Sequence, residues 1–158
     1  QGAMLTAILS VLGAIAMAVT GRISDRYGRT TTSSAIMVVA GVCSFTIGWL
    51  MNSPLWLLIT ISLIYGIAVV AESPIITTAV TELAPPGRLG AAQASQSFLG
   101  NITSLLAPVA FGAILDMGLW GGWGLAFSSL GVGAIVGAGL MLGLRQAKES
   151  LALAGGRR

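Results

Sequence analysis

The stretch LWLLITISLIYGIAVVAESPIITTAV, residues 55–80, decides the fold class of this chain. It carries a single charged residue, Glu72, and neither lysine nor arginine. A helix needs about 20 mostly apolar residues to cross the hydrocarbon layer of a bilayer. Because the stretch meets both the length and the composition, it is predicted to form a membrane-spanning helix.

Four further stretches share this composition, and none of them contains lysine or arginine. They are residues 3–20, 31–51, 91–115 and 122–144. Over the whole chain 55% of the residues are hydrophobic and 8% are charged, whereas a soluble protein carries about a quarter charged residues. Lipid admits only helices and closed barrels, and the alternating pattern of a barrel is missing. The sequence therefore predicts an all-α membrane protein with five transmembrane helices in a lipid bilayer.

The charged and aromatic residues divide between the two sides of this bundle. All lysines and arginines fall within residues 21–30, residues 83–90 and the tail, residues 145–158. Loops rich in these residues stay in the cytoplasm. The tryptophans lie toward the opposite helix ends, where indole rings favour the headgroup layer; they are Trp49, Trp56, Trp120 and Trp123. The N-terminus is thus predicted outside, and the C-terminus and its tail in the cytoplasm.

The composition also excludes several classes of function. The chain has no histidine and one cysteine, Cys43, so a disulfide framework and a thiolate metal site are both excluded. Its carboxylates are not clustered, so a metal site built from carboxylates is not expected either. With these residues the chain also lacks a nucleophile–base pair for catalysis. Its few basic residues are too scattered for a phosphate-binding face. We expect no enzymatic activity, cofactor or metal, and no nucleic-acid partner.

The first basic connection, GRISDRYGR at residues 21–29, has a distinctive order of residues. Gly21 and Gly28 allow a tight turn, including positive φ angles. Asp25 can accept hydrogen bonds from Arg26 or Arg29, or cap the positive end of a helix. The alternative is a solvated basic turn that serves topology alone.

This connection resembles the signature loop of the major facilitator superfamily in every defining position. A second one, ELAPPGRLG at residues 82–90, resembles the family's acidic–proline–arginine connection, although Leu89 separates Arg88 from Gly90. The resemblance implies that both loops form a cytoplasmic gate. Glu82 is expected to pair with Arg26 or Arg29, an exposed pair contributing about 0–1 kcal/mol to stability.

The resemblance also implies a position within the family fold, which contains two six-helix halves. Residues 55–80 lack the arginine usual in the fourth helix of the N-terminal half, and residues 107–112 with Asp116 resemble the eleventh helix. The chain begins at Gln1, which we interpret as a truncation without a signal peptide. It is predicted to be helices eight to twelve, a partial C-terminal half whose N-terminal half is missing.

Glu72 is the principal candidate for chemistry within the membrane. Ser62, Tyr65, Glu72 and Ser73 fall within about 100° at helical spacing, so they form one polar stripe along residues 55–80. A carboxylate at the bilayer centre costs about 2.5–3.5 kcal/mol. The hypothesis is that Glu72 carries the coupling proton or meets a cationic substrate. The alternative is a packing role near Pro74. The resemblance implies that residues 55–80 line the central cavity of the family fold. Gln96 and Thr103 border that cavity or bond to neighbouring helices.

These features predict transport of a small solute by alternating access, coupled to protons, with drug efflux the favoured case. The expected location is a cell membrane, the bacterial inner membrane by preference. An uncoupled facilitator or an organic-solute symporter of the same fold is the first alternative. A membrane scaffold that transports nothing is the second, and it would not need Glu72.

Overall fold

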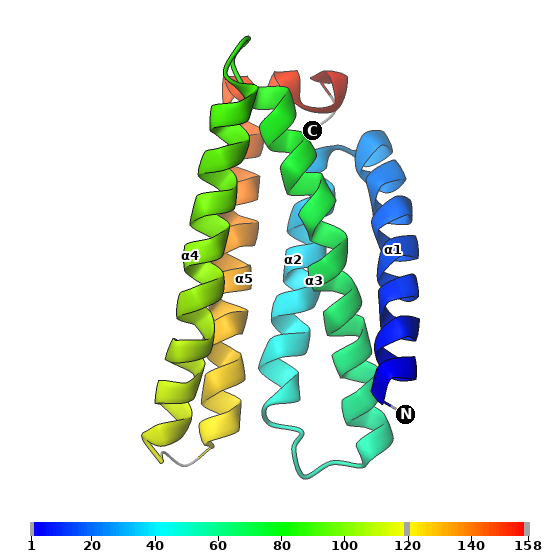
Figure 1. Cartoon of the computed structure of the whole chain (residues 1–158), viewed down its shortest axis with the longest axis vertical. Helices are drawn as coiled ribbons and strands as arrows, with labels where there is room; N and C mark the ends of the chain where they lie inside the picture. Colours follow the sequence, from blue (N-terminus) through cyan, green and yellow to red (C-terminus); the bar gives the residue numbers. More distant parts are fainter. Residues whose placement is uncertain (1, 119–120, 157–158) are drawn as a thin grey trace.

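The computed structural model describes residues 2–118 and 121–156, and it describes side chains from residue 11 onward, apart from that of residue 149. These residues form a bundle of long helices followed by a short 3₁₀ segment, and they include no strand (Figure 1). The elements are α1 Gly2–Tyr27, α2 Arg29–Ile47, α3 Leu55–Leu83, α4 Leu89–Asp116, α5 Gly122–Gln146 and η1 Lys148–Gly156. The expectation of an all-helical chain is confirmed.

Four of these helices, α2 to α5, are long and apolar enough to cross a membrane. The fifth predicted span, residues 3–20, falls within α1, but the side chains of residues 1–10 lie outside the described part. The count of five spans therefore stays a prediction. Helices that follow one another in the chain run in opposite directions, and the first and last described residues lie at opposite ends of the bundle (Figure 1).

The predicted boundaries need two corrections at the connections. The basic connection, expected over residues 21–30, is a single residue, because α1 continues to Tyr27 and α2 begins at Arg29. Gly28 makes this possible: its φ of 98° is a conformation that side chains disfavour, and its N–H donates to the Ser24 carbonyl at 3.0 Å. Gly21, expected to assist the turn, lies inside α1.

The second correction concerns residues 31–51, since α2 already ends at Ile47. Turn hydrogen bonds replace the helical ladder there, with the N–H of Leu50 donating to the Ile47 carbonyl at 3.1 Å. Pro54 then precedes the first turn of α3. The apolar run, residues 31–51, thus extends beyond the end of α2, because apolar composition alone does not show where the chain turns back.

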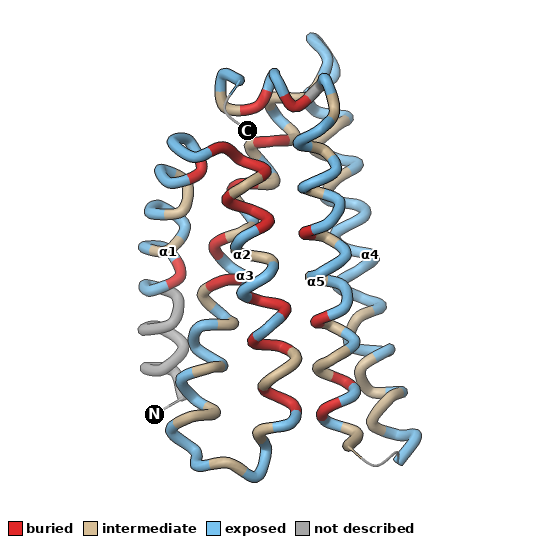
Figure 2. The backbone as a smooth tube through the Cα atoms, turned by 180° about the vertical axis from the view of Figure 1, so that it is seen from behind, coloured by how far each residue is buried: buried red, intermediate tan, exposed pale blue. Residues whose placement is uncertain are grey.

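Helix α2 holds the centre of the bundle. It packs against α5 on one side and α3 on the other, while α1 packs on α3. Figure 2 shows the buried residues concentrated along α2 and the faces that α3 and α5 turn toward it. Helix α4 buries none of its described residues. The apolar surfaces of α4 therefore require lipid or further protein to cover them.

Small residues bring α2 and α5 close together. A Cβ on Gly131 would lie 2.9 Å from the Phe45 ring, and one on Gly48 would lie 2.5 Å from the Trp123 carbonyl oxygen. The hydroxyl of Ser44 donates across the interface to the Phe127 carbonyl at 2.7 Å. Close approach of this kind is the usual way in which helices associate in lipid. Other glycines of α5 have open space around them, namely Gly133, Gly139 and Gly143.

Candidate functional site

One end of the bundle, here called the charged end, consists of the α1–α2 connection, the α3–α4 connection and η1 (Figure 1). At its centre Arg29, the first residue of α2, has a side chain that is only 10% exposed. Its Nε donates to Oε2 of Glu82 at 2.8 Å, and its Nη2 donates to Oε1 at 2.7 Å. Two parallel bonds between a guanidinium and a carboxylate fix geometry as well as charge. Of the two predicted partners of Glu82, the structure selects Arg29.

Asp25 belongs to the same cluster. Its Oδ1 lies 2.9 Å from Nη2 of Arg29, four residues later in the chain and on the other side of the Gly28 turn. The Nη1 atom of Arg29 lies 3.4 Å from the hydroxyl of Ser24, which is buried. One guanidinium therefore bridges α1, through Asp25 and Ser24, to the end of α3, through Glu82. The cluster holds two carboxylates around one arginine.

The two remaining arginines of the predicted gate lie outside this cluster. The guanidinium carbon of Arg26 stands 5.7 Å from the centre of the exposed Tyr27 ring. Arg88 is exposed just before α4. Within residues 2–118 and 121–156, neither of them forms an ion pair with Glu82. The direction of Arg26 follows from the helical path of α1, which continues past it.

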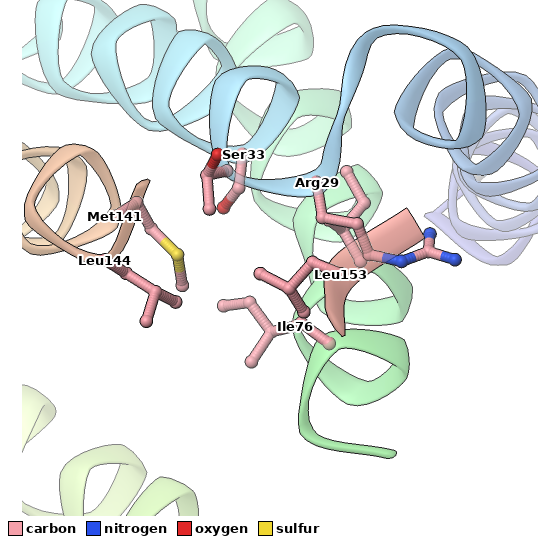
Figure 3. Close-up of a pocket in the computed structure, with 9 residues that line it drawn as sticks. Arg29, Ser33, Ile76, Met141, Leu144 and Leu153 are labelled. Atoms are coloured by element: carbon pink, nitrogen blue, oxygen red, sulfur yellow. The ribbon is translucent and has the colours of Figure 1, made fainter. Parts of the chain in front are cut away.

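The C-terminal segment adds a partner that the sequence did not reveal. The backbone N–H of Ala154 donates to Oε2 of Glu82 at 3.0 Å. Leu153, the preceding residue, is 1% exposed and lines a pocket between α2, α3 and α5. Figure 3 shows Leu153 close to Ile76, with Met141 and Leu144 facing them from α5. The basic tail was predicted only as a cytoplasmic extension, since its short apolar run carries no periodic signal.

Glu72, deep in α3, has a partner on another helix. The hydroxyl of Ser33 on α2 donates to Oε1 of Glu72 at 3.3 Å. Ser33 is 1% exposed, whereas Glu72 is half-buried. The contact directs this carboxyl toward the α2–α3 interface. Sequence reasoning placed Glu72 on the correct helix but did not identify Ser33, because the register between two helices is a tertiary property.

The other three residues of the predicted polar stripe of α3 differ from Glu72 in their surroundings. Ser62 and Ser73 are exposed on the helix surface and Tyr65 is half-buried. None of the three is joined to Glu72 by a hydrogen bond in the described structure. The hydrogen-bond partner of the Glu72 carboxyl therefore comes from α2 and not from the predicted stripe.

The polar residues of α4 tie that helix to α3. Nε2 of Gln93 donates to the Thr81 hydroxyl at 2.7 Å, and Nε2 of Gln96 lies 3.4 Å from the Thr77 hydroxyl. For Gln96 this supports bonding between helices, which is the commoner use of such side chains. Thr103 is exposed, and its hydroxyl donates to the Leu99 carbonyl of its own helix at 2.9 Å.

Among the described residues, no three side chains of histidine, cysteine, aspartate or glutamate lie together where they could hold a metal ion.

Comparison with known protein families gives one match, to the family described as the Major Facilitator Superfamily, over residues 1–157. Searches of curated proteins and of solved structures returned no match. The match covers nearly the whole chain, and the family consists of transporters for small molecules, not enzymes. The chain, a multi-pass membrane protein, therefore belongs to the Major Facilitator Superfamily.

Proposed function

We propose that this chain is part of a proton-coupled secondary transporter that moves a small solute by alternating access. The observation that carries the proposal is the Glu72–Ser33 contact inside two candidate membrane spans. A carboxyl group in a span costs free energy that proteins accept mainly where the group has a function. Glu72 is the group we assign to proton binding and release.

Ser33 gives this assignment a physical basis. A hydroxyl both donates and accepts, whereas an ionised carboxylate only accepts and a protonated one also donates. Ser33 can therefore donate to Glu72 in the charged form and accept from it in the neutral form. The carboxyl keeps a hydrogen-bond partner in both states, so the cost of leaving a buried polar group unpaired is avoided in each.

The charged end supplies the second element of the proposal, a latch. Arg29 joins α1 and α3 through Asp25 and Glu82. Parting α1 from α3 would leave at least one of these carboxylates without its cation, so the cluster favours the closed state of this end. We propose that Gly28 provides the close turn of this latch and that Gly21, Arg26 and Arg88 contribute mainly to the positive charge and shape of the two loops.

The proposed arrangement places the charged end in the cytoplasm and the N-terminus outside, in a bacterial inner membrane. The five helices would be helices eight to twelve of a longer transporter, with the missing half completing the substrate cavity around Glu72. The exposed apolar face of α4 supports this, since Leu105 is 71% exposed and Val109 65%. Cationic amphiphiles are the favoured substrates, because Glu72 is the one acid in residues 55–80. An uncoupled facilitator and a scaffold are the competing functions, and neither requires Glu72 to titrate.

The test is a flux measurement on the protein encoded by the complete reading frame, reconstituted in liposomes. The probe is ethidium, a cationic amphiphile, and the driving force is an imposed pH gradient. Glu72→Gln is expected to remove the acceleration that the gradient produces, lowering gradient-driven flux about tenfold or more, because an amide binds no proton near neutral pH.

Ser73→Ala is the matched control, since Ser73 is the exposed sequence neighbour of Glu72. It should retain the gradient response. Full gradient dependence in Glu72→Gln would contradict proton carriage by Glu72. A wild-type protein that moves no ethidium under any gradient would contradict the drug-efflux form of the proposal.

A further inference from the structure

The segment η1 folds back over the charged end instead of continuing away from α5. It contacts α1, α3 and α5 (Figure 1). Ser150, within it, is fully buried, and its hydroxyl donates to the Ala147 carbonyl at 2.7 Å. The segment therefore has a defined path, which brings Leu153 and Ala154 over the space between the helices.

Leu153 helps to line a small pocket at the charged end, and the accessible surface of this pocket is apolar. The other lining residues come from three helices: Arg29, Thr30 and Ser33 from α2, Ile75, Ile76 and Ala79 from α3, and Met141 and Leu144 from α5. Figure 3 shows Leu153 beside Ile76, with Met141 and Leu144 of α5 facing them. Transfer of a leucine from water into such surroundings is favourable. The Leu153 side chain, which is 1% exposed, thus lies where α2, α3 and α5 meet at the charged end.

Ala154 holds a conformation that needs support from its surroundings. Its φ of 47° makes it the one non-glycine residue with positive φ in the described part of the chain. A residue with a Cβ adopts this conformation at a cost, which persists where neighbouring contacts maintain it. Here the conformation directs the Ala154 N–H to Oε2 of Glu82, an atom that also accepts from Nε of Arg29.

We propose that the charged end contains a peptide-binding groove whose occupant is the chain's own tail, residues 148–156. Leu153 is the anchor, and the N–H of Ala154 is the tether to the Glu82 carboxylate. Binding of the tail and pairing of Arg29 with Glu82 favour the same arrangement of α2 and α3, so each strengthens the other. Release of the tail shifts the end toward its open state. This consequence rests on the latch proposed above, whereas occupancy of the groove rests on the contacts alone.

The experiment measures how accessible the groove is to a water-soluble reagent. The complete protein, purified in detergent with Cys43→Ser and without other reactive cysteines, carries Ala79→Cys. Ala79 is 7% exposed and lines the groove. Labelling by a charged maleimide is expected to be slow in this protein. It should become about tenfold faster or more when Leu153→Asp is added or when the chain stops after Ala147, because the groove is then open for most of the time.

Leu151→Asp is the matched control, since it adds the same charge to the same segment at a residue that is 54% exposed. It should label as slowly as the parent. A synthetic peptide with the sequence of residues 148–156 should restore slow labelling to the shortened chain, and the same peptide with aspartate in place of Leu153 should not. Ala154→Gly keeps the N–H and relieves the φ angle, so it should label no faster than the parent.

Equal labelling of the parent and Leu153→Asp would overturn the inference, as would equal acceleration by Leu151→Asp or lack of protection by the peptide. Size-exclusion profiles identical to the parent's establish that the variants are folded. Because the measurement uses neither substrate nor proton gradient, its failure and the failure of the transport proposal are separate results.

Discussion

Replacing Arg29 with alanine is expected to destabilise the bundle by about 2–3 kcal/mol, mainly the cost of leaving the partly buried Glu82 carboxylate without its cation. Arg29 makes two bonds to Glu82 and a third contact with Asp25. Glu82 is 24% exposed and Asp25 64% exposed. Water can therefore solvate the charge of Asp25 more fully than that of Glu82. For this reason the expected loss of stability is smaller than for a fully buried ion pair.

The measurement is the free energy of unfolding of the complete protein in mixed micelles, in a double-mutant cycle with Glu82→Gln. The double variant should lose less stability than the sum of the two single losses, because removing one charge also removes the penalty left by the other. Arg29→Lys should fall between wild type and Arg29→Ala, since an ammonium cannot form the two parallel bonds of a guanidinium.

Arg26→Ala is the control for this prediction. Arg26 lies in the same connection, is exposed and forms no ion pair with Glu82 in the described structure. Its loss should change the free energy of unfolding by less than about 0.5 kcal/mol. Additive losses in the cycle, or equal losses for Arg26→Ala and Arg29→Ala, would show that the Arg29–Glu82 pair does not hold the charged end together.

The second large effect is expected at the opposite end of α2. Gly48→Ala should cost about 3 kcal/mol of stability, at the upper end of what overpacking usually costs. The new Cβ would lie 2.5 Å from the Trp123 carbonyl oxygen and 2.7 Å from Cα of Gly124. Both atoms belong to the backbone of α5, so no side-chain rotation relieves the clash. The helices must separate, and the contacts along their interface weaken.

Gly133→Ala provides the comparison for Gly48→Ala. A Cβ on Gly133 would meet no atom within 4 Å, and alanine is a better helix former than glycine by up to about 1 kcal/mol. This variant should be as stable as wild type or slightly more so in the same unfolding measurement. Similar losses at the two positions would mean that α2 and α5 are not packed as closely at Gly48 as the structure has them.

The sequence by itself was sufficient for the class of the protein. Membrane-spanning character depends on length and composition, both of which are local properties, so residues 55–80 and 91–115 indicated α3 and α4 without any knowledge of packing. The residues of the first connection, above all Asp25 and Gly28, identified the family for the same reason, because a motif is a run of neighbouring residues. The number of spans, their orientation and the half of the fold stay predictions.

Tertiary structure alone decided which side chains meet. From the sequence, Arg26 and Arg29 were equal candidates to pair with Glu82. In the structure the chain turns at Gly28, so Arg29 begins α2 and pairs with Glu82, whereas Arg26 stays on α1. Ser33 became the partner of Glu72, and the backbone of Ala154 became that of Glu82, across 39 and 72 positions of chain respectively. Such pairs depend on the axial and rotational placement of whole helices. That placement is the sum of many contacts distributed along α2, α3 and α5, and no short stretch of sequence contains it.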